Sequence, residues 1–155
     1  MNARIVTRSA ISLVEQGTGI HTPASRLPMA EAAVAREMTR LGLSDPGIYL
    51  GLLRSNKHAM DGLLAELTVG ESYFFRIPEH FDLVRDVVLP DLLARRGRQR
   101  RPRVWSAGCS SGEEPYSLAI LFAELRQAVT IWATDVSHAA LERARAARYR
   151  AWAIR

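Results

Sequence analysis

The sequence predicts a mixed α/β protein in which an N-terminal all-helical bundle is followed by an incomplete Rossmann-like domain. Two short apolar runs, Val104–Ala107 and Thr130–Thr134, have the length of buried strands. The segment between them carries apolar residues at helical spacing, which gives the order strand, turn, helix, strand. Residues 1–93 show helical periodicity instead, so the helices are expected to precede the sheet.

Start and stop signals divide the N-terminal part into separate helices. Glycine favours the end of a helix and proline its first turn, and both residues recur between the apolar segments. The expected helical segments, in order, are Ala10–Glu15 ending near Gly17, Met29–Leu41 ending at Gly42, a helix begun by Ser44 as cap with Pro46 in its first turn, Met60–Leu67, and Phe81–Leu93 interrupted at Pro90.

We expect three regions along the chain. Residues 1–77 form the helical domain, residues 78–102 a linking helix with a basic loop, and residues 103–155 the first β-α-β-α part of the Rossmann-like domain. The stretch Ser72–Pro78 is the expected link, and its phenylalanines are suited to anchor one domain on the other.

A cluster of arginines precedes the first predicted strand and contributes much of the net charge of +5. Gly97 and Pro102 interrupt any helix there, so a solvated loop is the simplest interpretation, with contact to an acidic partner as the main alternative. Nucleic-acid binding is less favoured, because no aromatic residues alternate with these arginines to stack on bases. The cluster consists of Arg95, Arg96, Arg98, Arg100, Arg101 and Arg103.

Length and composition restrict the classes of protein to consider. A chain of 155 residues fits one domain, or a small helical module plus part of another. The single cysteine, Cys109, excludes an intrachain disulfide and a multi-cysteine metal site, and the histidines share no metal-ligand spacing. No apolar stretch approaches the roughly 20 residues of a membrane span, and the N-terminus lacks a secretory signal. We therefore expect a soluble cytoplasmic protein without a bound metal.

The stretch Gly108–Gly112 lies between the first predicted strand and the helix, which is the position of a nucleotide-cofactor turn. Its G-x-x-x-G spacing differs from the dinucleotide fingerprint and from the phosphate-cradling loop, which also needs a lysine. The helix opens with Glu113 and Glu114, which repel a pyrophosphate but suit an ammonium or sulfonium group. The turn therefore favours a cationic cofactor that carries an amino-acid moiety.

Asp135 follows the second strand and is placed to accept hydrogen bonds from ribose hydroxyls. Each acid also has a simpler explanation. Glu113 and Glu114 would stabilise the helix by about 0.3–1 kcal/mol as first-turn charges. Asp135 would cap the next helix, although Ser137 also suits that role. Cys109 is expected to be a small lining residue rather than a nucleophile.

The segment Val104–Ser117, with Ala133–Asp135, Ala140–Arg145 and Tyr149, resembles the S-adenosylmethionine-binding half of the chemotaxis receptor methyltransferase (CheR) family. The string W-S-A-G-C-S-S-G-E-E-P-Y-S is long and distinctive. Glu71–Arg76 resembles the segment that joins the helical domain of that family to its catalytic domain. The resemblance covers the chain from about Leu43 onward and, more weakly, its start.

This resemblance implies methyl transfer from S-adenosylmethionine to glutamate side chains of a chemotaxis receptor, with S-adenosylhomocysteine as a product. It implies Arg76 as the residue involved in methyl transfer and Glu114 as the holder of the amino-acid end of the cofactor. Gly70 stands where the family has an asparagine, and so lacks that amide. The cofactor-binding residues that the resemblance implies are Ser72, Arg76, Ala107, Gly108, Gly112, Glu113, Glu114 and Asp135.

The resemblance also implies a partner, a methyl-accepting receptor that presents an acidic helical surface to the basic helical domain. Arg26, Arg36 and Arg40 are candidates for that contact, and a solvated helix face is the alternative for them. Nucleic acid and membrane insertion are not expected.

The chain departs from the family by ending soon after the second strand and its helix, whereas those enzymes continue through several more strands. Two parallel strands leave unpaired edges, so we expect dimerisation through an edge, weak cofactor binding and no turnover by this chain alone. The alternative function is that of a non-catalytic remnant that binds a receptor or a signalling partner.

Overall fold

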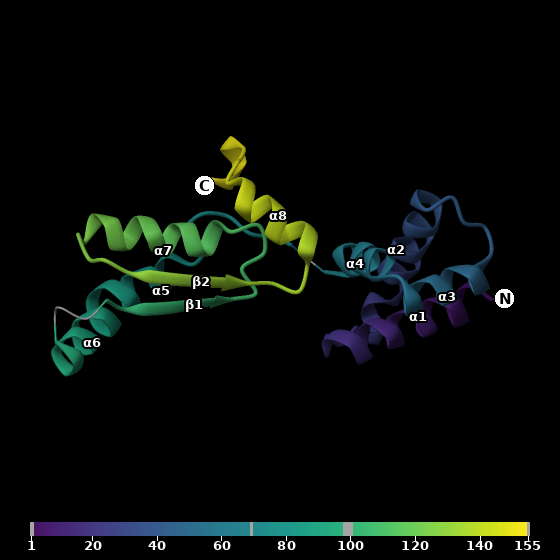
Figure 1. Ribbon diagram of the computed structural model, residues 1–155, viewed down its shortest axis with the longest axis horizontal. Helices are drawn as coiled ribbons and strands as arrows, with labels where there is room; N and C mark the ends of the chain where they lie inside the picture. Colours follow the sequence, from purple (N-terminus) through teal and green to yellow (C-terminus); the bar gives the residue numbers. More distant parts are fainter. Residues whose placement is uncertain (1, 69, 98–100, 155) are drawn as a thin grey trace. The chain divides into compact units, whose positions relative to one another are not determined.

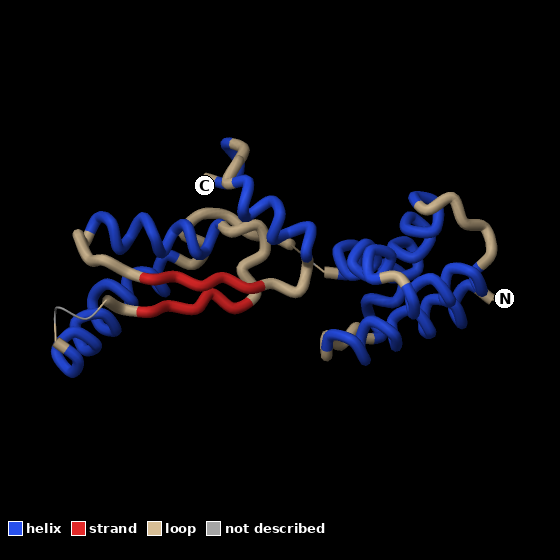
Figure 2. Tube along the Cα trace, in the orientation of Figure 1, coloured by secondary structure: helices blue, strands red, loops and turns tan. Residues whose placement is uncertain are grey.

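A computed structural model of the chain describes residues 2–68, 70–97 and 101–154 and confirms the mixed α/β class. The chain divides into two compact units, which Figures 1 and 2 show as ribbon and tube. The first unit comprises Met1–Val69 with Ser137–Ala139, and the second comprises Gly70–Val136 with Ala140–Arg155.

The first unit is built from helices that enclose one apolar core. Its largest fully buried side chains are Tyr49, Leu63, Leu64 and Val14, which come from three different helices. Burial of such side chains is the main source of stability, at about 1.5–3 kcal/mol for each large aliphatic residue. The helices are α1 (Ala3–Thr18), α2 (Leu27–Arg40), α3 (Pro46–Ser55) and α4 (Lys57–Leu67), with a 3₁₀ turn at Ala24–Arg26.

Side-chain caps fix where α1, α3 and α4 begin. Asp45, not Ser44, caps α3, because its carboxylate accepts hydrogen bonds from the N–H groups of Gly47 and Ile48. Pro46 occupies the first turn as predicted. The cap is Asp45, one residue later than the predicted Ser44. Asn56 caps α4 in the same way.

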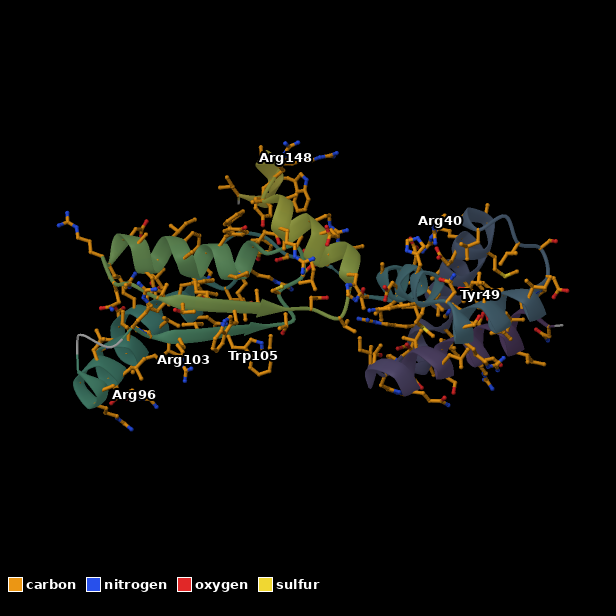
Figure 3. The ribbon with its side chains drawn as sticks, viewed as in Figure 1. Arg40, Tyr49, Arg96, Arg103, Trp105 and Arg148 are labelled. Atoms are coloured by element: carbon orange, nitrogen blue, oxygen red, sulfur yellow. The ribbon has the colours of Figure 1, made fainter. Side chains whose placement is uncertain are left out.

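The buried carboxylate of Glu37 forms an ion pair with the exposed Arg40 beside Tyr49. Glu37 is 2% exposed and accepts two hydrogen bonds from the Arg40 guanidinium, at 2.6 and 2.8 Å. Burial, followed by the negative charge of Glu37, raises the pKa of Tyr49 well above its ordinary value. Figure 3 shows Arg40 and Tyr49 in the same unit. Glycine is required at position 62, since a Cβ there would collide with the Glu37 carboxylate.

The second unit contains a parallel sheet with helices before, between and after its strands (Figure 1). Its elements are α5 (Pro78–Leu83), a π-helical turn at Val84–Val88, α6 (Leu89–Arg96), β1 (Arg103–Ala107), α7 (Glu113–Glu124), β2 (Thr130–Thr134), α8 (His138–Ala146) and a 3₁₀ turn at Ala151–Ala153.

The chain stays helical through Pro90, but the regular α-helix is interrupted just before it by a π-helical turn, close to the predicted position. Leu89 donates its N–H to the carbonyl of Val84, five residues earlier, and this wider π-helical turn runs directly into α6. Proline has no N–H to donate, and its ring clashes with the carbonyl four residues before it in a regular helix. The wider turn therefore accommodates Pro90 in the first turn of α6 without ending the helix.

The two predicted strands are hydrogen-bonded neighbours, as the sequence analysis requires. They are parallel, with Val104 opposite Ile131 and Trp105 opposite Trp132. Val104 and Ile131 pack with Phe81, Leu118 and Leu121 in the apolar core of this unit.

The other face of the sheet is exposed. Trp105 is 67% and Trp132 54% exposed, and Figure 3 shows Arg103 and Trp105 projecting from β1 on the side away from α7. The Arg103 guanidinium lies 5.6 Å from the centre of the Trp132 ring. Parallel sheets are normally covered on both faces, so this apolar face is unusual for a parallel sheet.

The arginine cluster is only partly the loop that was expected. Arg95 and Arg96 belong to α6, where Arg95 pairs with Asp91, and Arg103 belongs to β1. Arg98 and Arg100 lie outside the described residues. The register of the sheet also brings Trp132 to Arg103, an aromatic neighbour that sequence order did not reveal.

Among the helices that the structure describes, none is both long and apolar enough to cross a membrane.

Candidate functional site

The turn between β1 and α7 is fixed to the end of β2. The N–H groups of Gly108 and Cys109 both donate to the carbonyl of Thr134, at 2.8 and 2.9 Å. The turn requires left-handed backbone conformations at Gly108, with φ 78°, and at Gly112, with φ 98°. The turn therefore lies at the carboxyl-terminal edge of the sheet, where the two parallel strands end.

Asp135 contacts the middle of that turn. Its Oδ2 accepts a hydrogen bond of 2.8 Å from the N–H of Ser110, and Ser110 has the left-handed φ of 48°. A non-glycine residue in this region carries strain that the surrounding contacts must hold. The half-buried Asp135 carboxylate thus stabilises the turn and lies at its edge.

The two glutamates that open α7 have different surroundings. Glu113 is 2% exposed, and both of its carboxylate oxygens accept from the Ser111 hydroxyl, at 3.0 and 2.9 Å. Glu114 is exposed, and its Oε1 accepts a hydrogen bond of 2.6 Å from the Ser106 hydroxyl of β1. Of these two glutamates, Glu114 alone presents a solvent-accessible carboxylate beside the turn.

The segment with Ser72 and Arg76 is attached to the same region by its backbone. The Phe75 N–H donates to the Ser117 hydroxyl at 2.9 Å, and that hydroxyl donates to the Glu113 carbonyl at 2.7 Å. The Phe74 N–H donates to the Ala153 carbonyl at 2.8 Å. Ser72 is half-buried.

Arg76, which the resemblance implies in methyl transfer, is exposed. Its Nη1 donates to the Glu71 carbonyl at 2.6 Å, and the guanidinium lies 5.9 Å from the centre of the Tyr73 ring. These contacts keep the side chain at the surface, where a carboxylate from outside the chain can reach it.

Cys109 does not have the environment of a nucleophile. Its side chain is 1% exposed, and burial, followed by the negative charge of Asp135, raises the pKa of the thiol. A thiol with a raised pKa is protonated at neutral pH and therefore unreactive. Among the described residues, no group of three or more histidine, cysteine or acidic side chains is arranged to hold a metal ion.

The geometry fits a small cofactor that carries positive charge and hydroxyl groups. A Cβ on Gly108 would meet no other atom within 4 Å, so the space beside this residue is open. The Ser110 hydroxyl oxygen is buried without a hydrogen-bond partner in the described part of the chain. The exposed Glu114 and the half-buried Asp135 supply negative charge at the same edge. Ala107 is exposed there and has no bulk to obstruct a ligand.

Sequence reasoning identified the glycines and acids of this edge but missed the residues that hold them. Side chains alternate between the two faces of a strand, and this alternation places Ser106 on the buried face, toward α7. Its contact with Glu114 could have been predicted from that pattern. Ser117 lies one helical turn after Glu113, and Tyr149 was noted without a role. The Tyr149 hydroxyl donates to the Ser111 carbonyl at 2.8 Å.

Comparison with known proteins gives a consistent result. The family model described as CheR methyltransferase, SAM binding domain, matches residues 70–155. The chain is 38% identical over 149 residues to a chemotaxis protein methyltransferase of Escherichia coli K12, which covers 92% of this chain and 50% of that protein.

Two further relatives agree with this match. A chemotaxis protein methyltransferase of Salmonella typhimurium is 35% identical over 92% of this chain and 49% of its own length. One of Borreliella burgdorferi is 30% identical over 90% of this chain and 53% of its own length. The chain spans about half the length of these curated relatives.

Proposed function

Because the chain belongs to the CheR methyltransferase family, we propose that residues 70–155 form the methyl-donor half of a protein-glutamate O-methyltransferase site. The observation that carries this proposal is that Glu114 and Asp135 are both held by hydrogen bonds beside the turn after β1. Glu114 bonds to Ser106 at the end of β1, and Asp135 bonds to the turn that follows β1. Two carboxylates beside one open glycine turn suit a cofactor with an ammonium group and a ribose.

Each residue of the edge has a proposed role toward S-adenosylmethionine. Glu114 binds the ammonium of its methionine part, and Asp135 accepts from the ribose hydroxyls. Ala107 and Gly108 leave space for the cofactor, and Gly112 lets α7 begin close to the strand. Glu113 supports the turn through Ser111, while Ser72 and Arg76 approach from the preceding segment.

When bound, S-adenosylmethionine supplies a methyl group activated by its sulfonium charge and is converted to S-adenosylhomocysteine. The acceptor glutamate, with an ordinary pKa of about 4.3, is already an anion at neutral pH, so no general base is needed. Arg76 orients that carboxylate through its planar guanidinium. The chain contributes alignment and exclusion of water rather than acid-base chemistry.

The proposed acceptor is a glutamate of a cytoplasmic chemoreceptor surface, which is acidic and helical. In the first unit, Arg36 pairs with Glu66 at 2.8 Å and Arg40 with Glu37 at 2.6 Å. Arg36 is on the surface, where its ion pair contributes little to stability. We propose that a receptor carboxylate competes with Glu66 for Arg36, whereas Arg40 stays with the buried Glu37.

The fold of the second unit is proposed to be the first part of a Rossmann-like methyltransferase domain, with the helical residues 1–77 as the receptor-contacting domain and 78–102 as the link. The described sheet has unpaired outer edges and an exposed face with Trp105 and Trp132. We therefore expect cofactor binding by the 155-residue chain to be weak, with a Kd of about 1 mM. A low-micromolar Kd by calorimetry on monomeric chain would contradict this expectation.

The unpaired edges also predict self-association through the sheet. Sedimentation at increasing protein concentration is expected to show dimers, and Trp105→Lys is expected to reduce them, because a lysine on the edge strand β1 opposes pairing with another strand. A chain that stays monomeric at millimolar concentration would contradict this proposal.

Asp135→Asn tests the donor site directly. The amide oxygen can still accept from the Ser110 N–H, so the turn is retained, but the negative charge that attracts ribose hydroxyls is lost. We expect the Kd for S-adenosylmethionine, measured by NMR titration, to rise about tenfold or more. The control is Asp91→Asn, which removes the same charge from an exposed pair with Arg95. Equal affinities of the two variants would contradict the role of Asp135.

A second candidate function is a receptor-binding module without turnover, and the exposed position of Arg36 on the first unit favours it. Receptor-containing membranes and radiolabelled S-adenosylmethionine separate the two. Saturable binding of the radiolabelled S-adenosylmethionine supports the methyl-donor half, and co-sedimentation of the chain with the membranes without such binding supports the module. A chain that does neither contradicts both proposals.

A further inference from the structure

Tyr149 contacts three parts of the second unit that are all distant from Tyr149 itself in the sequence. Its hydroxyl donates to the Ser111 carbonyl at 2.8 Å, in the cofactor turn. Its ring lies edge-on to Phe74, with centroids 4.9 Å apart at 86°, and to Tyr116, with centroids 5.9 Å apart at 72°. The side chain therefore joins the turn, the segment that precedes Arg76, and the helix α7.

A residue after Tyr149 makes a second contact with the segment that precedes Arg76. The Ala153 carbonyl accepts from the Phe74 N–H at 2.8 Å. Between these contacts and Arg76 lies Phe75, whose φ of 53° is in the left-handed region. Such a conformation costs of the order of 1–2 kcal/mol per residue. The contacts of Phe74, together with the bond from the Phe75 N–H to Ser117, are thus needed to hold the backbone before Arg76 in place.

The hydroxyl of Tyr149 is packed closely over the turn. A Cβ built on Gly112 would lie 2.8 Å from that oxygen and 2.9 Å from the Cβ of Ala144. Burial, followed by the charge of Glu113, raises the pKa of Tyr149 to about 12. The hydroxyl therefore remains a neutral donor throughout the range in which a cytoplasmic protein works.

We propose that Tyr149 is a positioning residue that sets the cofactor turn at Ser111 and the backbone before Arg76 relative to one another. This inference rests on the proposed function, because it matters only if the donor binds at the turn and the acceptor at Arg76. In-line transfer depends on the separation of these two positions, and a misplacement of about 1 Å is enough to slow it strongly.

Tyr149→Phe tests the proposal, because it removes the hydroxyl and keeps the ring contacts to Phe74 and Tyr116. The matched control is Tyr116→Phe, whose hydroxyl also donates to one backbone carbonyl, that of Ala144, at 3.2 Å. That bond does not involve the turn. Both variants lose one hydroxyl donor from neighbouring rings of the same cluster.

The first measurement is amide hydrogen exchange of the turn without cofactor. We expect the amides of Ser110–Gly112 to exchange about 3- to 10-fold faster in Tyr149→Phe than in the parent chain, as loss of one hydrogen bond predicts. We expect less than about a twofold change in Tyr116→Phe. Equal acceleration in the two variants would mean that the hydroxyl of Tyr149 only adds stability, and would overturn the proposal.

The second measurement is the NMR titration with S-adenosylmethionine. We expect the Kd to rise about 3- to 10-fold in Tyr149→Phe and to stay within about twofold in Tyr116→Phe. An unchanged Kd in Tyr149→Phe overturns the proposal. If the parent chain itself binds no S-adenosylmethionine, the proposed function fails, while the exchange rates still decide whether Tyr149 fixes the turn.

Discussion

Gly112→Ala is expected to lower the free energy of unfolding of the second unit by about 2–5 kcal/mol. The φ of 98° costs an alanine roughly 1–2 kcal/mol. The new Cβ also meets the Tyr149 hydroxyl at 2.8 Å, the Ala144 Cβ at 2.9 Å and the Ala144 Cα at 3.2 Å. Because the Ala144 atoms cannot rotate away, this crowding adds about 1–3 kcal/mol.

Gly108→Ala is the matched control for that substitution. Gly108 also has a left-handed φ, of 78°, but its Cβ would meet nothing within 4 Å. We expect only the backbone cost of about 1–2 kcal/mol. Tryptophan fluorescence during denaturation measures both variants, since Trp105, Trp132 and Trp152 all lie after residue 69. Equal destabilisation by the two substitutions would show that the close contact at Gly112 is absent.

Gly62→Ala is expected to destabilise the first unit by about 2 kcal/mol, although alanine normally favours a helix. The new Cβ would collide with Oε1 of Glu37 and lie 3.0 Å from Nη2 of Arg40. The Glu37 side chain is 3% exposed and is held by two hydrogen bonds, so it has no open space to move into. Displacing it disturbs the ion pair with Arg40, and leaving the buried Glu37 carboxylate unpaired is costly.

Gly51→Ala, in contrast, is expected to raise the free energy of unfolding of the first unit. Gly51 lies in α3, and its Cβ would meet nothing within 4 Å. We expect a gain of about 0.5–1 kcal/mol from the lower entropy of the unfolded chain. Far-UV circular dichroism during urea denaturation follows these helices. A stabilising Gly62→Ala would contradict the described packing of Glu37.

Much of the second unit could be predicted because its signals are local. The apolar runs of β1 and β2 and the helical spacing between them determine the strand order, and the glycines mark the turn. Asp135 was expected at the end of β2, and its position directly after a strand was enough to bring it to the turn. Each of these predictions needs only the apolar periodicity of one segment or the residue type at one position.

The remaining contacts depend on the relative position of two elements, which no local pattern contains. Ser106 meets Glu114 only because strand alternation and the phase of α7 agree. Arg103 meets Trp132 because of the parallel register. The cap of α3 and the π-helical form of the turn before Pro90 were missed for another reason. Two neighbouring residues, Ser44 and Asp45, both suit a cap, and a π-helical turn has no simple sequence signature.

The most direct test of the donor site is amide chemical-shift mapping of the isotope-labelled chain with S-adenosylmethionine. We predict that the largest saturable changes fall on Gly108–Gly112, on Glu114 and on Asp135, with residues of the first unit unaffected. No saturable change at any of these amides up to about 10 mM, an affinity weaker than about −3 kcal/mol, would contradict the account. Changes centred on the exposed face of Trp105 and Trp132 would contradict it as well.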